Sequence, residues 1–409
     1  MVVPDWLRVL ILLGCAASLP QAQHRILLTD TATNRHFDGF FLSAAELGYP
    51  GDWSVRRETL RGGKQEGVDR IVIDAGRVVA EILPTRGMSI HSLRCDGVRL
   101  GWDSPSSEIV HPALIDLESR GGLGWLEGFN EWMVRCGLEF AGHPGEDVLV
   151  DADGNETRRA LSLHGRVGNL PAARVELLID ERPPHRLRLR GTVLEQSFYG
   201  AKLRLQTEFS VVPGEARWRL SDTVTNTGAQ PQEMQLIYHA NYRTPLLGAG
   251  ARVVVPARRI APMTPKAEAA FDGWDTYGAP EVGFEEEVFL IEPYADAAGR
   301  SRALLVDPAG ERATSVSWHT SELPYFTLWK NTAALADGYV TGLEPGTSFP
   351  FNRRVERAAG RVPVLAPGAS RSFTLDYDFV QGAERVREAE AQVRAIQGER
   401  STERLGVPE

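Results

Sequence analysis

The sequence predicts an all-β fold of antiparallel strands that ends in a short C-terminal helix. Three observations support this prediction. Four consecutive segments between residues 173 and 226 alternate apolar and polar side chains with a period of two. Turn-forming residues are abundant, with 40 glycines and 25 prolines in 409 residues. Apolar residues recur at helical spacing only near the C-terminus.

The four alternating segments form the clearest part of the predicted sheet. They are 173–180, 185–193, 201–212 and 216–226, and they are separated by Pro183-Pro184, Tyr199-Gly200 and Pro213-Gly214. One face is rich in arginine, and the other carries leucine, valine and tryptophan. Such alternation is typical of an antiparallel sheet with one solvated face and one buried face.

Further strands are expected on both sides of this region. Residues 68–83 predict two strands around the turn Asp74-Ala75-Gly76, whereas residues 24–66 show no sustained period. Later strands are predicted at 236–238, 325–330, 338–345 and 373–379. In the tail, Val386, Ala389, Val393 and Ile396 recur at helical spacing, and Gly398 ends the predicted helix.

Composition and charge limit the classes of function. The chain is 43% hydrophobic and 24% charged, which fits one large all-β domain or two smaller domains. A net charge of −9 argues against a nucleic-acid surface. No internal apolar run has the length of a transmembrane helix. The oligomeric state is left open.

The first 23 residues differ from the rest of the chain. Arg8 is followed by a short apolar run and small residues, which is the outline of a secretory signal. Leu12-Leu13-Gly14-Cys15 is similar to a bacterial lipoprotein box, so lipid attachment at Cys15 is the alternative. We therefore expect an exported protein, periplasmic or extracellular. The only other cysteines, Cys95 and Cys136, have the option of pairing.

Common cofactor motifs are not found in the sequence. It contains no Gly-x-Ser-x-Gly elbow, no Walker loop and no His-Glu-x-x-His motif. Nine histidines are scattered without ligand spacing. We therefore expect no cofactor and no metal site.

Three residues at predicted strand ends have acid–base chemistry. His239 follows the apolar run Leu236-Ile237-Tyr238, His164 ends a short alternating run, and Glu344 precedes Pro345. An imidazole and a carboxylate facing one ligand can transfer protons to and from it. The alternative for His239 alone is a hydrogen-bonded histidine at the edge of the core.

Other residues have two interpretations. Trp125, Phe129 and Trp132 suit a sugar-stacking wall or a corner of the core equally well. Arg86, beside a glycine, suits either ligand hydroxyls or an ion pair. The run Glu285–Glu287 is interpreted as a solvated edge.

The chain resembles the aldose 1-epimerase (galactose mutarotase)-like superfamily, and within it a divergent branch of unknown function, DUF4432. The resemblance covers most of residues 68–380. The residues that carry it are Leu163-His164-Gly165, Asp222–Gly228, Tyr238–Tyr242 and Gly342–Pro345, with Arg86-Gly87-Met88, Gly121–Gly137 and Pro245-Leu246-Leu247 as marks of the branch.

The resemblance implies a large antiparallel β-sandwich, a supersandwich, over residues 24–380, followed by a helix and tail at 381–409. It implies that Glu344 is the general base and His239 the general acid. His164 would hydrogen-bond the sugar. The other expected substrate-binding residues are Arg86, Arg166, Asn241, Asp275 and Lys330. Arg166 stands where the family has a second glycine, which suits an acidic or modified sugar.

The resulting expectation is a carbohydrate-active isomerase that binds a small sugar and interconverts its anomers by acid–base ring opening. Two alternatives remain. One is a carbohydrate-binding protein without turnover, and the other is a glycan lyase or hydrolase on a related sandwich.

Overall fold

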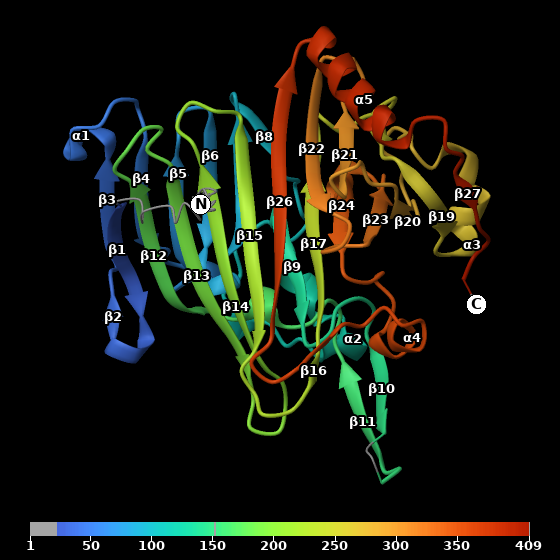
Figure 1. Cartoon of the computed structure of the whole chain (residues 1–409), viewed down its shortest axis with the longest axis horizontal. Coiled ribbons are helices and arrows are strands. Elements are labelled where there is room, and N and C mark those ends of the chain that lie inside the picture. Colours follow the sequence, from blue (N-terminus) through green and yellow to red (C-terminus); the bar gives the residue numbers. More distant parts are fainter. Residues whose placement is uncertain (1–22, 151–152, 409) are drawn as a thin grey trace, which may run out of the picture.

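A computed structural model describes residues 23–150 and 153–408. The predicted signal segment, apart from Gln23, and Cys15 lie outside the described residues. Two large sheets pack face to face around one core, with a helix near the C-terminus (Figure 1). The predicted β-sandwich with a short C-terminal helix is therefore confirmed.

The first large sheet has ten strands, and its neighbouring strands run antiparallel. In spatial order they are β18 (Arg252–Val254), β21 (Arg300–Val306), β22 (Arg312–His319), β26 (Ser370–Gln381), β15 (Arg217–Asn226), β14 (Lys202–Val211), β13 (Leu187–Gln196), β12 (Ala172–Asp180), β1 (Gln23–Asp30) and β2 (Arg35–His36).

The second large sheet has thirteen strands and is antiparallel except where β27 lies parallel to β19. In spatial order they are β27 (Glu403–Arg404), β19 (Ala257–Pro262), β20 (Glu287–Pro293), β23 (Tyr325–Asn331), β24 (Val340–Gly346), β17 (Gln235–Tyr242), β9 (Met133–Leu138), β7 (Ser89–Cys95), β6 (Val78–Leu83), β5 (Asp69–Asp74), β4 (Ser54–Thr59) and β3 (Gly39–Ser43), with β8 (Val98–Leu100) paired to β7.

Two small two-stranded sheets, five α-helices and eight short 3-10 helices make up the other elements of the described residues. The small sheets are β10 (Gly145–Val150) with β11 (Glu156–Leu161), and β16 (Gln232–Glu233) with β25 (Val364–Leu365). The helices are α1 (Ala44–Leu47), α2 (Ser119–Gly122), α3 (Pro265–Ala269), α4 (Arg353–Ala358) and α5 (Ala383–Gln397).

The predicted meander is present as β12 to β15, in register as consecutive antiparallel neighbours. On β13 the apolar side chains Leu187 and Leu189 are buried, whereas Arg190 on the other face is exposed. The period of two therefore assigned both the strands and their solvated face correctly.

Strands were missed in residues 24–66, where the sequence shows no period. On β4, Val55 and Arg57 both point into the protein, so a buried arginine interrupts the apolar face. The Arg57 guanidinium is satisfied there, because it donates to the Leu28 carbonyl at 2.8 Å and to Asp69 at 2.9 Å. A buried charge with partners hides a strand from a hydrophobicity pattern.

The predicted tail helix is confirmed as α5, which covers part of the ten-stranded sheet (Figure 1). Val386, Ala389 and Val393 are buried against Leu304 and Val306 of β21. Four further short helices, which the sequence did not predict, lie in loops.

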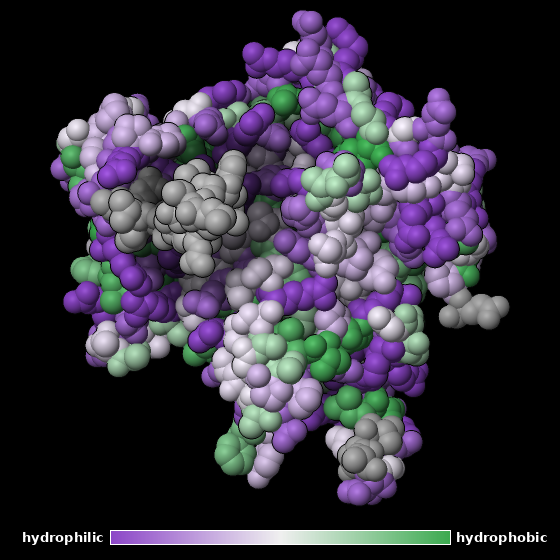
Figure 2. All heavy atoms as spheres, viewed as in Figure 1, coloured by the Kyte–Doolittle hydropathy of each residue, from purple (hydrophilic) through white to green (hydrophobic). Residues whose placement is uncertain are grey.

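The two cysteines in the described part of the chain do not pair. Cys95 on β7 and Cys136 on β9 are both free and buried. Hydrophilic residues cover much of the face in Figure 2, with hydrophobic residues in small groups. No helix in the described residues is long and apolar enough to cross a membrane.

β17 is buried on both of its faces, because the alternation of a strand sends its side chains in two directions. Leu236, Tyr238 and Ala240 point into the main core between the sheets. Ile237 belongs instead to a second apolar cluster on the outer face of the thirteen-stranded sheet. Since His239 lies two residues after Ile237, it faces the outer side as well.

A buried polar cluster joins the two sheets beside β17. Arg135 of β9 forms an ion pair with Asp222 of β15, and it donates to Thr207 of β14 at 2.7 Å. The Tyr238 hydroxyl donates to the same Asp222 carboxylate at 2.9 Å. All four residues are buried. The cluster therefore ties β9 and β17 to the opposite sheet.

We predict that Asp222→Asn lowers the free energy of unfolding by about 3–5 kcal/mol, because it leaves the Arg135 guanidinium buried without a counter-charge. Urea unfolding followed by circular dichroism measures this change. The matched control is Asp376→Asn on β26, whose pair with Arg219 is partly exposed and whose loss costs about 1 kcal/mol or less. Equal losses in the two variants would contradict the prediction.

Candidate functional site

A cavity of about 320 Å³ lies on the outer face of the thirteen-stranded sheet. Its floor comes from β17, β23 and β24, and its walls come from the loops around residues 123–129, 143–144 and 163–164. The polar lining residues are His143, His164, His239, Glu286, Thr327 and Glu344. It therefore combines the three residues that the sequence predicts as the acid–base group.

The strand register places the floor residues side by side. Glu344 pairs with Thr327 of β23, and on its other side Ala240 of β17 pairs with Leu343. In that register His239 stands opposite Glu344. Directly paired residues of antiparallel strands point to the same face, so both side chains enter the cavity.

His239 and Glu344 form the buried end of the cavity. The His239 Nε2 atom lies 3.3 Å from Glu344 Oε1, and the two side chains are only 5% and 2% exposed. The contact has the distance of an ion pair without hydrogen-bond alignment, because Glu344 Oε1 has no hydrogen-bond partner. His239 Nδ1 is also buried and unpartnered. Unpaired polar atoms of this kind are costly unless a ligand uses them.

Gly342 leaves the space that the pair needs. A Cβ atom at this position would lie 2.3 Å from Glu344 Oε1 and 3.2 Å from His239 Cε1. Gly342 stands two residues before Glu344 on the same face of β24, so any side chain there would displace the carboxylate. A glycine within a strand often marks such a close approach.

His164 approaches the pair from a loop. Its ring centroid lies 5.5 Å from that of His239 and 4.7 Å from that of Trp125, both in edge-on geometry. The residue has a positive φ of 58°, which is uncommon outside glycine and is often found at functional sites. Its Nδ1 atom is buried without a hydrogen-bond partner.

Burial shifts the pKa values of the pair in opposite directions. Desolvation lowers the pKa of His239 to about 4. Desolvation, with a smaller contribution from the negative charge of Glu286, raises the pKa of Glu344 well above its ordinary range. Both directions favour the uncharged forms, with His239 neutral and the proton on Glu344. Opposed shifts of this kind mark acid–base partners.

The aromatic residues separate into wall and core. Phe129 lies edge-on to His239 with ring centroids 5.1 Å apart, and Trp329 does the same from β23 at 5.3 Å. Trp125 packs against Phe129 and also lines the cavity. Trp132 is instead fully buried in the main core with Trp218. Trp132 is therefore a core residue, whereas Trp125 and Phe129 line the cavity.

The run Glu285–Glu287 is not simply a solvated edge. Glu285 is exposed, but Glu286 lines the cavity and accepts a hydrogen bond from Trp329 Nε1 at 2.6 Å. Glu287 is buried and lies 3.2 Å from Lys330 Nζ. Glu286 is not identifiable as a cavity residue from the sequence, because a local charge run carries no signal of a distant cavity.

The two predicted arginines lie outside the cavity lining. Arg86 is buried and donates to Glu131 at 2.7 Å, to the Val110 carbonyl and to the Gly128 carbonyl. It therefore braces the aromatic loop from behind. Arg166 donates to Glu139 at 2.7 Å and faces a different surface hollow.

The three other predicted binding residues are also absent from the cavity lining. Asn241 is buried beside His239 and donates to the Glu131 carbonyl at 3.0 Å. Lys330 donates to the Gly273 carbonyl at 3.0 Å and lies over the Tyr277 ring. Asp275 lies in the same loop as Gly273. Asn241 thus supports the strand of His239, whereas Lys330 anchors a neighbouring loop.

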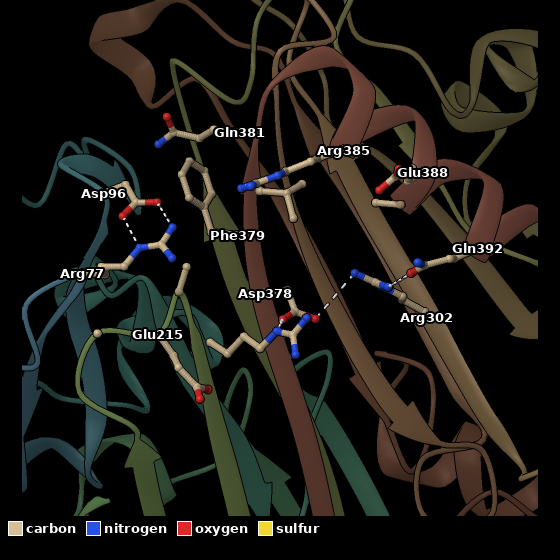
Figure 3. A pocket seen from close by; sticks show the side chains of 15 residues that line it. Arg77, Asp96, Glu215, Arg302, Asp378, Phe379, Gln381, Arg385, Glu388 and Gln392 are labelled. Carbon is tan, nitrogen blue, oxygen red and sulfur yellow. Dashed lines mark hydrogen bonds and ion pairs between the residues drawn. The ribbon is translucent and has the colours of Figure 1, made fainter. Parts of the chain in front are cut away.

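A larger groove of about 640 Å³ runs beside α5 over the ten-stranded sheet (Figure 3). Several of its polar side chains partner one another. Arg77 donates to Asp96 at 2.6 Å, while Arg302 donates to Gln392 at 2.8 Å and lies 3.5 Å from Asp378. The groove holds no buried acid–base pair like that of the smaller cavity, so we assign the candidate site to the latter.

Comparison with known proteins identifies the family. Residues 65–379 match the family described as Domain of unknown function (DUF4432). The crystal structure of a candidate aldose 1-epimerase from Klebsiella pneumoniae is similar, with 38% identity and a TM-score of 0.89, over 95% of this chain and 99% of that chain. No curated protein matches.

Two more distant structures are similar in fold alone. A galactose mutarotase-like protein from Clostridium acetobutylicum has 15% identity and a TM-score of 0.57, over 80% of this chain and 98% of that chain. A galactose mutarotase related enzyme from Lactobacillus acidophilus has 12% identity and a TM-score of 0.52, over 77% and 98%. The chain therefore belongs to the DUF4432 family, a branch of the aldose 1-epimerase (galactose mutarotase)-like superfamily.

Proposed function

We propose that the protein is an isomerase of aldose 1-epimerase type, which interconverts the anomers of a small sugar. The observation that carries this proposal is the buried His239–Glu344 pair, 3.3 Å apart and with unpartnered polar atoms, at the end of an aromatic-walled cavity. A carboxyl and an imidazole on one face of a sheet are the groups that ring opening needs. The similar Klebsiella protein supports the same reaction class.

In the proposed reaction, one member of the pair takes the proton from the anomeric hydroxyl while the other protonates the ring oxygen. The bond between C1 and the ring oxygen breaks, and a free aldehyde forms. Rotation about the C1–C2 bond and reclosure on the opposite face give the other anomer. The two proton transfers then run in reverse, so the pair ends as it began.

The resemblance assigns Glu344 as the base and His239 as the acid. The pKa directions instead favour a resting proton on Glu344, since burial favours the uncharged form of both groups. Both assignments put one proton on the pair, on His239 in the first and on Glu344 in the second. We propose that the pair works as a unit with one transferable proton, which sugar binding moves between the two residues.

The walls have supporting roles in this proposal. Trp125, Phe129 and Trp329 exclude water and offer ring faces and edges to the apolar faces of a sugar. His164, with a free Nδ1 atom near the pair, is placed to hydrogen-bond a sugar hydroxyl. These contacts would hold the anomeric carbon against His239 and Glu344.

Two alternatives are less well supported. A binding protein without turnover would use the same aromatic walls, but it has no need of a buried acid–base pair. A lyase or hydrolase acting on polymers needs an extended cleft, whereas the cavity of about 320 Å³ suits a single sugar unit. The signal-like segment at residues 1–23 supports the further proposal that the protein acts outside the cytoplasm.

We predict that Glu344→Gln and His239→Asn each lower kcat by about 10²- to 10⁴-fold, because each removes one positioned proton transfer. NMR measurement of anomer exchange, or polarimetry, gives the rate on each sugar tested. The double variant should lose little more than the worse single variant, because the two groups act together.

The matched control is His143→Asn, since His143 is an exposed residue at the rim of the same cavity. Its kcat should stay within about threefold of the parent, as expected for a group without a proton transfer. Thermal unfolding of all variants checks the fold. Full activity in His239→Asn would restore the interpretation of His239 as an edge histidine.

We predict a bell-shaped pH dependence of kcat/KM, because the pair needs one proton. Activity falls at low pH as His239 gains a proton, with a pKa of about 4. It falls at high pH as Glu344 loses its proton, at a pKa raised well above the ordinary carboxyl range. In Glu286→Gln a nearby negative charge is lost, the pKa of Glu344 decreases, and the alkaline limb moves to lower pH.

The control for this shift is Glu285→Gln, the adjacent exposed glutamate outside the cavity lining. Its profile should superimpose on that of the parent protein. An alkaline limb that stays in place in Glu286→Gln would show that Glu286 does not act on Glu344.

A further inference from the structure

The lining of the cavity is mostly apolar. Ten of the sixteen lining residues are tryptophan, phenylalanine, leucine, methionine, valine or proline. At the mouth, Leu123 and Leu126 are 36% and 39% exposed, so the apolar surface continues to the solvent. Away from the His239–Glu344 pair, the polar side chains among the described lining residues are those of His143, His164, Glu286 and Thr327.

The cationic side chains near the cavity pair with carboxylates that do not line it. Arg86 binds Glu131, Arg166 binds Glu139, and Lys330 lies 3.2 Å from Glu287. None of these three cations is among the described residues that line the cavity. An anionic group on a ligand would therefore find no counter-charge within it.

Negative charge is provided instead. Glu286 stands at the exposed rim and is held there by its hydrogen bond from Trp329 Nε1 at 2.6 Å. Glu344, at the buried end of the same cavity, adds no cation to offset this charge. A ligand entering past Glu286 meets a carboxylate before it reaches the pair.

We propose that the cavity selects an uncharged, hydroxyl-poor aldose of the deoxy sugar class, and that Glu286 is the residue that turns anionic sugars away. This inference rests on the proposed function and names its substrate class. It departs from the acidic sugar that Arg166 suggests in the sequence, since Arg166 faces another surface.

Two physical effects act together in this selection. A sugar hydroxyl pressed against leucine or methionine loses its hydrogen bonds to water without replacement, whereas a methyl or methylene group at the same place gains from burial. A carboxylate, phosphate or sulfonate that passes Glu286 at the rim meets like charge.

Sugars that differ only at C6 test the selection. D-galactose, 6-deoxy-D-galactose and D-galacturonate form one series, and the corresponding gluco sugars form a second. We expect kcat/KM for anomer exchange, measured by NMR, to be roughly 10- to 100-fold higher for the 6-deoxy sugar than for the hexose in the preferred series. The uronate should be at least about tenfold lower than the hexose.

Glu286→Gln tests the role of the rim carboxylate. Glutamine keeps an acceptor for Trp329 Nε1 and removes the charge, so we expect the uronate-to-hexose ratio of kcat/KM to rise about tenfold at the pH optimum of each variant. Glu285→Gln, with its side chain outside the cavity, should leave the ratio unchanged.

The outcomes separate this inference from the proposed function. A uronate used as well as the hexose, or a hexose preferred over its deoxy form in both series, overturns the inference while turnover stands. If no sugar turns over, the proposed isomerase fails, and calorimetry on the same sugars tests the selection alone. Binding in the order deoxy sugar, hexose, uronate then supports the inference, and any other order, or no binding at millimolar concentrations, overturns it.

Discussion

The ion pair between Arg135 and Asp222 holds the two sheets in the orientation on which the site depends. It spans the core of the sandwich, and the Tyr238 hydroxyl donates to the same carboxylate. Because side chains alternate along a strand, holding Tyr238 inward directs His239 outward into the cavity. A polar cluster in the core thus sets the direction of a functional side chain on the other face of the sheet. Networks of this kind favour one arrangement when every member is satisfied.

On the outer face of β17, in contrast, buried polar atoms are left without partners. His239 and Glu344 are buried there with polar atoms that have no hydrogen-bond partner, and Gly342 keeps the space beside them open. Such atoms reduce the stability of the folded protein, and a well-packed apolar pair would increase it. The site therefore holds groups that are suited to a ligand rather than to the fold, a common trade between stability and activity.

Much of the sandwich follows from local patterns, and the site follows from them only in part. The period of two identified β12 to β15, because one face of these strands is solvated. It failed at β4, where the buried Arg57 occupies an apolar face. His239 and Glu344 were each visible as strand ends, but their proximity depends on a register between strands a hundred residues apart. Glu286 appeared in the sequence only as part of a local charge run. Arg86 was expected to bind the ligand, but it pairs with the buried Glu131, and no local pattern reveals this contact.

The His239–Glu344 pair and the walls of the cavity come from different kinds of structure. The pair is carried by adjacent strands in the middle of a large sheet, whereas Leu123, Leu126 and Trp125 are carried by a loop. A substitution in the loop changes the shape and polarity of the walls without moving the strands below. Under the proposed function, a lineage can therefore exchange one sugar for another by changing surface loops while the buried pair is kept, and two members with the same reaction need not share a substrate.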